Sequence, residues 1–283
     1  MSDAIARRHA DSVSRIALGQ RCLAPRGLAR LPQLGSRLLT FAIVELQKLR
    51  HDRTELVTRA VQPTLWLLIF GETFSRIRAI STSNVPYLSF LAPGIIAQSA
   101  LFISIFYGIQ IIWDRDAGIL NKLLVTPTPR AALIAGKAFA AGIRSIAQVL
   151  IIVALCLVLR IRISVDPAHV LGAAAVVFLG SAFFSCLSMM LAGIMQTRDR
   201  MMGIGQAITM PLFFASNALY PVNLMPAWVR ALSRVNPLSY QVSALRGLLI
   251  GTATNLWLDF TVLLLMALLA IWLAASLLER LVR

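Results

Sequence analysis

Residues 87–112 read YLSFLAPGIIAQSALFISIFYGIQII, a run without a single charged side chain. An α-helix rises 1.5 Å per residue, so about 20 apolar residues cross the hydrocarbon core of a bilayer. Five further apolar blocks accompany this run, and together they predict membrane spans near 57–75, 87–112, 132–159, 168–195, 201–220 and 257–278. The sequence therefore predicts an all-α membrane protein with six transmembrane helices.

Composition supports this class. Of the 283 residues, 58% are hydrophobic and 14% are charged, whereas soluble domains carry roughly a quarter charged residues. Three cysteines without CxxC spacing argue against a disulfide framework and a zinc site. The net charge of +15 would suggest a nucleic-acid partner in a soluble protein. Here the basic residues crowd the first 55 positions and the block edges, so membrane topology and lipid headgroups explain them better.

Two segments precede the first span. Residues 1–36 are rich in Arg, Ser, Gly and Pro and contain no hydrophobic run. We expect a flexible cytoplasmic tail there, with an organelle transit peptide as the alternative. Residues 37–55 combine an apolar side with a charged one. They suit an N-terminal interfacial helix or a plain extension of the first span, and residues 37–283 then form the transmembrane domain.

The distribution of Lys and Arg predicts the orientation. With the N-terminus inside, cytoplasmic segments hold 17 of these residues and external segments hold 7. Counted only from Arg37 onward, the ratio is 11 to 7, with the same sign. By the positive-inside rule both termini are cytoplasmic.

No phosphate-binding loop of the form GxxxxGK[ST] occurs in the chain, and no GxGxxG follows a predicted strand. The chain is therefore expected not to be an enzyme and to bind no cofactor or metal. If it is a pump, ATP and magnesium must bind to another polypeptide.

Residues 113–130, WDRDAGILNKLLVTPTPR, form the most informative cytoplasmic loop. Asp114, Arg115 and Asp116 end the second span, a short apolar run follows, and Pro127 and Pro129 stop it. Such a helix serves either as a docking site for a partner or as a hairpin cap on the headgroups. Composition alone leaves both open.

This part of the chain resembles the membrane subunit of type-2 ABC exporters. The matching motifs are Pro93-Gly94, Asp114-Arg115-Asp116-Ala117-Gly118, Leu123-Leu124-Val125-Thr126-Pro127-Thr128-Pro129-Arg130 and Gly136-Lys137. Residues 224–228 (LMPAW) and 236–247 (NPLSYQVSALRG) are similar to that family's external re-entrant segment. The likeness is greatest to the branch of drug-resistance and nodulation-factor exporters.

The external segment also makes sense from its residues alone. Pro226 and Pro237 break the half-apolar stretch 222–250, and Asn223 and Asn236 precede candidate helix starts. Non-helical backbone at membrane depth needs protein or water around it, which two short helices dipping into the outer leaflet would satisfy. The alternative is a surface loop with an interfacial helix.

The resemblance implies a permease of the plasma or inner membrane that pairs with a second permease copy, identical or different. Two ATPase subunits would bind its cytoplasmic face and drive export of an amphiphilic drug, lipid or glycolipid. The implied coupling residues are Asp114, Arg115, Asp116, Gly118, Leu120, Asn121, Lys122, Leu123 and Leu124. The implied external gate consists of Pro226, Trp228, Asn236, Pro237, Tyr240 and Arg246.

A candidate substrate path combines one cation with aromatic side chains of the spans, namely Arg144, Phe102, Phe106, Phe213 and Phe214. Arg144 follows Arg130 and Lys137 at seven-residue steps and lies deepest, so it should face protein or an aqueous cleft. Two other functions stay open: an ion-coupled secondary transporter, which normally needs acids within its spans, and an intramembrane enzyme built on Ser181.

Overall fold

The computed structural model describes residues 58, 61–71, 73, 85–118, 130–195 and 197–282, except the side chains of Arg130, Arg198 and 278–282. All of them belong to the compact unit Thr40–Arg283. Within these ranges every regular element is a helix, which confirms the all-α class. The expected tail (1–36), interfacial helix (37–55) and coupling segment after Gly118 lie outside the described residues.

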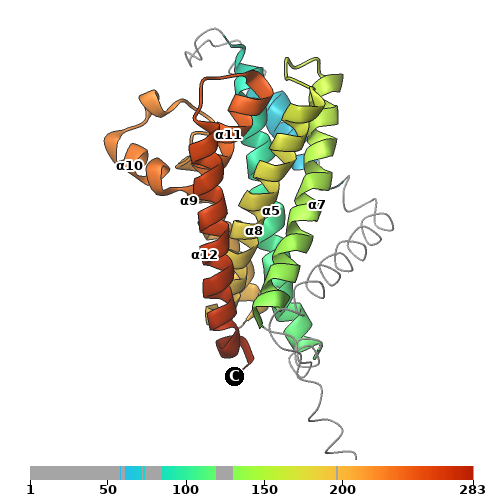
Figure 1. Ribbon diagram of the computed structural model, residues 1–283, viewed down its shortest axis with the longest axis vertical. Helices are drawn as coiled ribbons and strands as arrows, with labels where there is room; N and C mark the ends of the chain where they lie inside the picture. The colour runs from blue at the N-terminus through green and yellow to red at the C-terminus, as the bar shows by residue number, and fades with distance from the viewer. Residues whose placement is uncertain are drawn as a thin grey trace, which may run out of the picture. The chain divides into compact units, whose positions relative to one another are not determined.

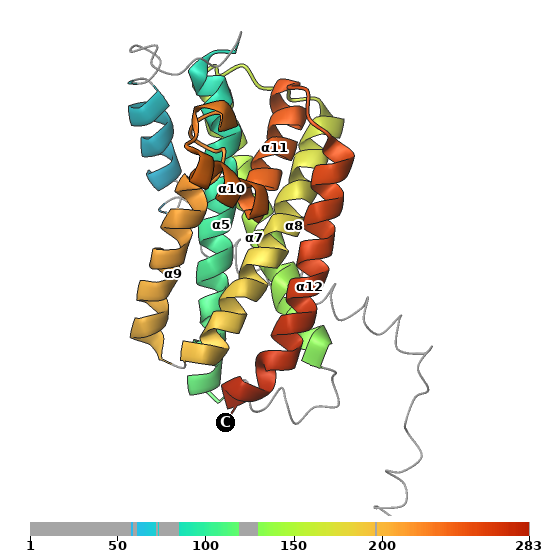
Figure 2. The same ribbon diagram turned by 90° about the vertical axis from the view of Figure 1, so that its left-hand side faces the viewer.

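Within the described part of the chain, four helices are long and apolar enough to cross a membrane. They are α5 (Tyr87–Asp116), α7 (Arg130–Val158), α8 (Pro167–Met195) and α12 (Leu256–Val282). Figures 1 and 2 show them side by side as one bundle. In the most apolar stretch of α5, 78% of the residues are buried, against 22% in α12. Thus α5 forms the core of the bundle, whereas α12 exposes Trp257, Leu265 and Trp272.

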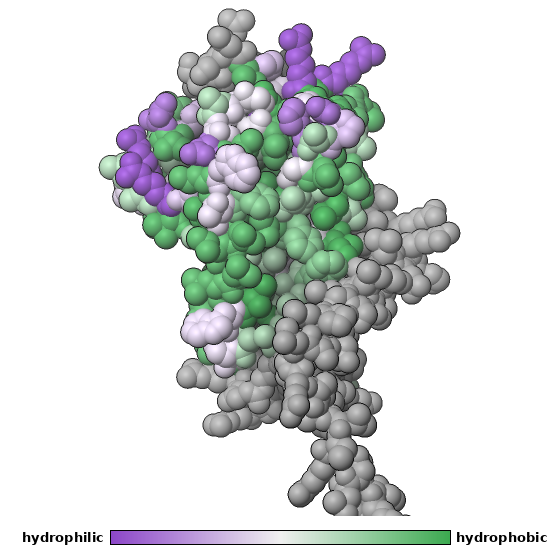
Figure 3. Space-filling model, viewed as in Figure 1, coloured by the Kyte–Doolittle hydropathy of each residue, from purple (hydrophilic) through white to green (hydrophobic). Residues whose placement is uncertain are grey.

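The surface has the polarity of a membrane protein. In Figure 3 hydrophobic residues cover the middle of the visible face, and hydrophilic ones gather towards the end that carries α10 and the α7–α8 connection. Exposed Leu and Trp in such numbers would be a liability in water. In lipid they cost nothing, because the acyl chains are as apolar as the side chains.

Two of the six expected spans are represented among the described residues by shorter helical stretches. Residues Val61–Phe70 are helical and include the π-helix η3 (Trp66–Phe70), and α9 covers Arg198–Phe214. The 17 residues of α9 reach only about 26 Å. The helix ends before the expected position 220 because the chain turns at Ser216, whose hydroxyl donates to the Phe213 carbonyl (2.6 Å).

Two short helices follow α9, as the sequence predicted, after the 3-10 turn η4 (Val222–Leu224). They are α10 (Ala227–Val235) and α11 (Pro237–Ile250), and each follows a proline break. Asn236 caps α11, since its Oδ1 accepts a hydrogen bond from the Leu238 N–H (3.0 Å). Asn223 also precedes a helix start but does not cap it: it lies inside η4, and Pro226 directly precedes α10. In Figure 1, α10 lies to the side of the bundle.

Glycines let the helices approach closely, as is usual in lipid. A Cβ at Gly94 would lie 2.5 Å from the Ala218 carbonyl oxygen, in the backbone after α9. A Cβ at Gly108 would lie 2.4 Å from Ser188 Cβ on α8. Both positions on α5 are therefore closed to any larger residue without movement of the backbone opposite.

Replacing Gly94 with alanine should lower the free energy of unfolding by about 1–3 kcal/mol, because the backbone that it meets cannot move as a side-chain tip does. Thermal unfolding in lipid nanodiscs would measure the change. Gly203→Ala on α9 is the matched control, since no described atom lies within 4 Å of its Cβ position. It should be neutral or stabilise by up to about 1 kcal/mol. Equal melting of both variants would contradict the close contact.

Candidate functional site

The two motif regions lie at opposite ends of the bundle. The end of α5, the start of α7 and the end of α12 meet at one end, and the start of α5 and α11 lie at the other (Figure 2). This arrangement agrees with the predicted order of loops. The helix α5 runs from one of these ends to the other.

At the first end, a largely buried ion pair joins α5 to α7. The Asp114 carboxylate pairs with the Lys137 ammonium of α7, and these side chains are only 21% and 12% exposed. Arg115 pairs with Asp116 at 3.1 Å on a more open surface. Asp114 therefore links α5 to α7, whereas the side chains of Arg115 and Asp116 are more exposed.

The chain leaves α5 at Gly118, which has a φ of +71°, a conformation that favours glycine. Its N–H donates to the Arg115 carbonyl (2.9 Å) and closes the last turn. The remaining expected coupling residues, Leu120, Asn121, Lys122, Leu123 and Leu124, lie outside the described residues.

At the other end, Arg246 of α11 joins three segments. Its side chain is 6% exposed and lies over the Phe90 ring, 3.6 Å from the centroid. Its guanidinium donates to the Phe90 carbonyl (3.3 Å) and to the Ala218 carbonyl (3.0 Å). The hydroxyl of Tyr87 donates to the next carbonyl, that of Leu219 (3.1 Å). Gly94 and Arg246, which belong to separate motifs, thus meet at the backbone of Ala218.

The other expected gate residues shape the α10–α11 hairpin. Asn236 donates from Nδ2 to the Leu212 carbonyl at the end of α9 (2.6 Å), and Tyr240 donates to the Arg234 carbonyl (2.7 Å). Pro226 and Pro237 mark the two helix starts. Trp228 is 69% exposed and makes no part of this network. The hairpin is therefore fixed to α9 and α5 by backbone-directed bonds.

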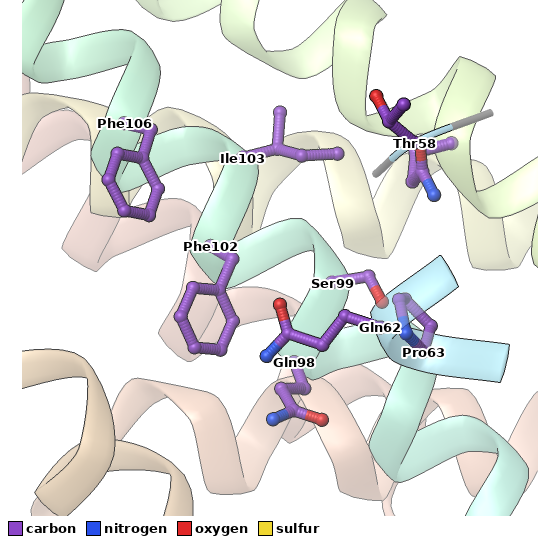
Figure 4. Close-up of a pocket in the computed structure, with 9 residues that line it drawn as sticks. Thr58, Gln62, Pro63, Gln98, Ser99, Phe102, Ile103 and Phe106 are labelled. Carbon is purple, nitrogen blue, oxygen red and sulfur yellow. The ribbon is translucent and has the colours of Figure 1, made fainter. Parts of the chain in front are cut away.

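A cavity of about 370 Å³ opens between Val61–Phe70, α5 and α7. Its lining includes Phe102 and Phe106, two residues of the expected substrate path, and also Gln62, Gln98, Ser99 and Gln148. Figure 4 shows Gln62 of the first helical segment beside Gln98, Ser99 and Phe102 of α5. The site is thus apolar and aromatic at one side and rich in uncharged hydrogen-bonding groups at the other.

The rest of the expected path lies elsewhere. Phe213 is buried against Trp66, with ring centroids 5.7 Å apart, and Phe214 is 44% exposed on the outside of α9. Arg144 is half-buried with its guanidinium over the Tyr107 ring of α5, 5.1 Å from the centroid. It therefore faces protein, as its depth in the span required.

Polar side chains follow the contact between α5 and α7, which we call the α5–α7 seam. From the Asp114 end it comprises Asp114–Lys137, Tyr107–Arg144, Ser104–Ser145 (3.4 Å) and then Gln148 of the cavity. From Lys137 to Gln148 the rise along α7 is roughly 16 Å. The seam therefore connects the end that carries the ion pair with the cavity wall.

Sequence reasoning missed the glutamines of the cavity. Glutamines within spans are expected to bond between helices, yet Gln98 Nε2 and both amide atoms of Gln148 have no hydrogen-bond partner among the described residues. Such a group costs about 1–3 kcal/mol when buried. The only sequence signal was the presence of an uncharged amide in each of two neighbouring apolar spans.

The structure does not bring Ser181 and His169 together, as an intramembrane serine enzyme built on these two residues would need. Ser181 is fully buried, and His169, twelve residues earlier on α8, lies about 18 Å away along the helix axis. His169 instead contacts Ser164 (2.8 Å) at the start of α8. A serine nucleophile needs a base within hydrogen-bond reach, which Ser181 does not have in His169.

Comparison with known proteins shows which family model and which proteins this chain is similar to. Residues 37–250 match the family model described as ABC-2 type transporter. The chain is 30% identical to ycf38 of Cyanophora paradoxa, which is named a transport permease, over 70% of this chain and 69% of that protein. It is 27% identical to the daunorubicin resistance ABC transporter permease protein DrrB1 of Streptomyces coeruleorubidus (77% and 76%). It is 24% identical to the inner membrane transport permease YadH of Escherichia coli (68% and 73%).

Replacing Arg246 with lysine should destabilise the protein by about 2 kcal/mol or more, because one ammonium cannot bond both carbonyls and also lie flat on the Phe90 ring. The measurement is thermal unfolding in nanodiscs. Arg234→Lys serves as the control, since Arg234 is exposed on α10 and should tolerate the change. An Arg246→Lys variant as stable as Arg234→Lys would show that the contacts of Arg246 with Phe90 and Ala218 contribute little to stability.

Proposed function

This chain belongs to the ABC-2 type transporter family. We propose that it is the permease subunit of an ATP-driven exporter whose ATPase is a separate chain. The observation that carries the proposal is the family match together with two motif regions at opposite ends of one bundle. The lack of a GxxxxGK[ST] loop in the sequence supports a separate ATPase that binds ATP and magnesium.

In the proposed topology the chain crosses the plasma or inner membrane six times. The helical segment Val61–Phe70 and α9 supply the two spans beyond the four long helices. Residues 37–55 lie as a helix at the inner surface, and both termini are cytoplasmic. The excess of Lys and Arg in the inner loops supports this orientation.

The ATPase is proposed to dock on residues 115–124. Exposed ion pairs add little affinity each, so Leu120, Leu123 and Leu124 are expected to supply most of the binding energy. Because Asp114 is paired with Lys137, a push on this loop would reach α5 and α7 together. Asp114 thus acts by positioning the loop.

The α10–α11 hairpin is proposed to be the external gate, dipping into the outer leaflet. Its exposed apolar residues Trp228, Leu232 and Val235 support contact with lipid or with a second permease copy. The cargo is proposed to be an amphiphilic drug, lipid or glycolipid. The name of DrrB1 connects that relative with daunorubicin resistance, which supports this class of cargo without identifying it.

Replacing Leu123 and Leu124 with alanine should reduce copurification of an ABC ATPase several-fold, because the apolar docking surface is lost. Affinity purification from membranes of the source cell, followed by quantification of the ATPase, makes the measurement. Leu232→Ala, an exposed apolar truncation on α10, should leave the yield unchanged. If no ATPase accompanies the unaltered chain, the proposed function is wrong.

Single cysteines should report the orientation. In a variant without the three native cysteines, Lys122→Cys should react with a membrane-impermeant maleimide only after the cells are permeabilised. Arg234→Cys, at an exposed polar position of α10, should react in intact cells. Labelling in the reverse order would invert the topology and remove the docking site from the side where ATP is available.

A further inference from the structure

We propose that the cavity between Val61–Phe70, α5 and α7 binds an uncharged, flat ligand that carries hydrogen-bonding oxygen or nitrogen atoms. As a statement about cargo, the inference rests on the function proposed above. As a statement about binding, it rests on the cavity alone. We call this cavity the glutamine cleft, after Gln62, Gln98 and Gln148 in its lining.

The buried amides carry the argument. Gln98 is 3% exposed on α5 and Gln148 is 1% exposed on α7. Nε2 of Gln98 and both amide atoms of Gln148 have no hydrogen-bond partner among the described residues. Buried polar groups in proteins are nearly always bonded, so two such amides beside a cavity indicate that a guest completes their bonds. The terminal torsion of glutamine is broad, and the amides can turn towards that guest without leaving their rotamers.

Two more polar groups reach the same space from neighbouring positions. The Ser99 hydroxyl donates to the Ile95 carbonyl (2.8 Å), so its lone pairs can accept a bond from a ligand. Gln62 extends from the first helical segment towards Gln98 (Figure 4). Three helices therefore present both donors and acceptors, which suits a ligand with carbonyl, hydroxyl or amide groups.

An aromatic wall sets the shape of the ligand. The rings of Phe102 and Phe106 lie one helical turn apart, with centroids separated by 6.4 Å and planes inclined by only 11°. Both rings line the cleft, and Ile103 and Pro63 add aliphatic surface. Near-parallel rings favour a flat, conjugated partner in offset stacking. The volume of about 370 Å³ lies within the range of small-molecule sites.

The lining also selects against charge. Among the described residues that line the cleft, none is charged. Arg144, one turn from Gln148 on α7, lies over the Tyr107 ring and does not belong to the lining. An ionic ligand would lose its hydration without gaining a counter-charge. The amides of the cleft therefore favour a ligand that has polar groups but no net charge.

Two dyes with the same ring system test the inference: Nile red, which is neutral and has a ring carbonyl, and Nile blue, its cationic counterpart. Binding is measured by fluorescence titration of the purified full-length protein in one detergent. The unaltered protein should bind Nile red more tightly than Nile blue. Gln98→Met with Gln148→Met should weaken Nile red binding about tenfold, as the loss of two hydrogen bonds predicts.

Gln241→Met is the matched control. Gln241 is also fully buried with both amide atoms unbonded among the described residues, but it lies on α11 and does not line the cleft. Methionine resembles glutamine in length and flexibility. This variant should bind Nile red as the unaltered protein does. All three replacements should melt at the same temperature as the unaltered protein or higher, because each removes an unbonded buried amide.

Several results would overturn the inference: no binding of Nile red, equal binding by the double variant, or tighter binding of Nile blue. Marked destabilisation by Gln148→Met would also overturn it, since the amide would then have a structural role. Because this assay needs no ATPase, its failure is separate from that of the proposed function. If the permease copurifies with an ATPase but does not bind Nile red, only the proposed ligand class is refuted.

Discussion

The bond from the Arg246 guanidinium to the Ala218 carbonyl is the contact on which the α11 end of the bundle depends. It joins α11 to the turn after α9, and the Phe90 carbonyl extends the same guanidinium to α5. Without water, every donor on this side chain needs a protein acceptor, and backbone carbonyls are acceptors that cannot rotate away. Gly94 then lets α5 approach the same backbone closely. The Arg246 cation and the absence of a side chain at Gly94 thus hold together α11, α5 and the turn after α9.

Much of this architecture could be predicted from sequence because lipid imposes simple rules. Uncharged blocks had to be helices, and Pro226 and Pro237 had to break the segment after α9. Asn236 precedes a helix start as expected and caps α11, since this motif is local. Asn223 also precedes a helix start but does not cap it, because Pro226 takes the position before α10.

What sequence could not give is which side chains of different spans face each other. Asp114 carries the expected charge, yet its partner Lys137 is a neighbour only because α7 packs on α5. Phe102, Phe106, Phe213 and Phe214 look alike in sequence, but two line the cleft and two do not. Likewise, the sequence of a single helix does not show whether a glutamine side chain is hydrogen-bonded to a neighbouring helix or lines a cavity. These are properties of packing between segments far apart in the chain.

The length of α5 has a mechanical consequence. Thirty residues extend about 45 Å, roughly 15 Å more than the hydrocarbon layer is thick. Close contacts at Gly94 and Gly108 hold this helix against the backbone after α9 and against α8, and the Asp114–Lys137 pair links its far end to α7. A displacement of the Asp114 end would therefore be shared with those neighbours. The cleft residues 98–106 lie between the two glycine contacts, so the shape of the cleft depends on how these packed segments move together.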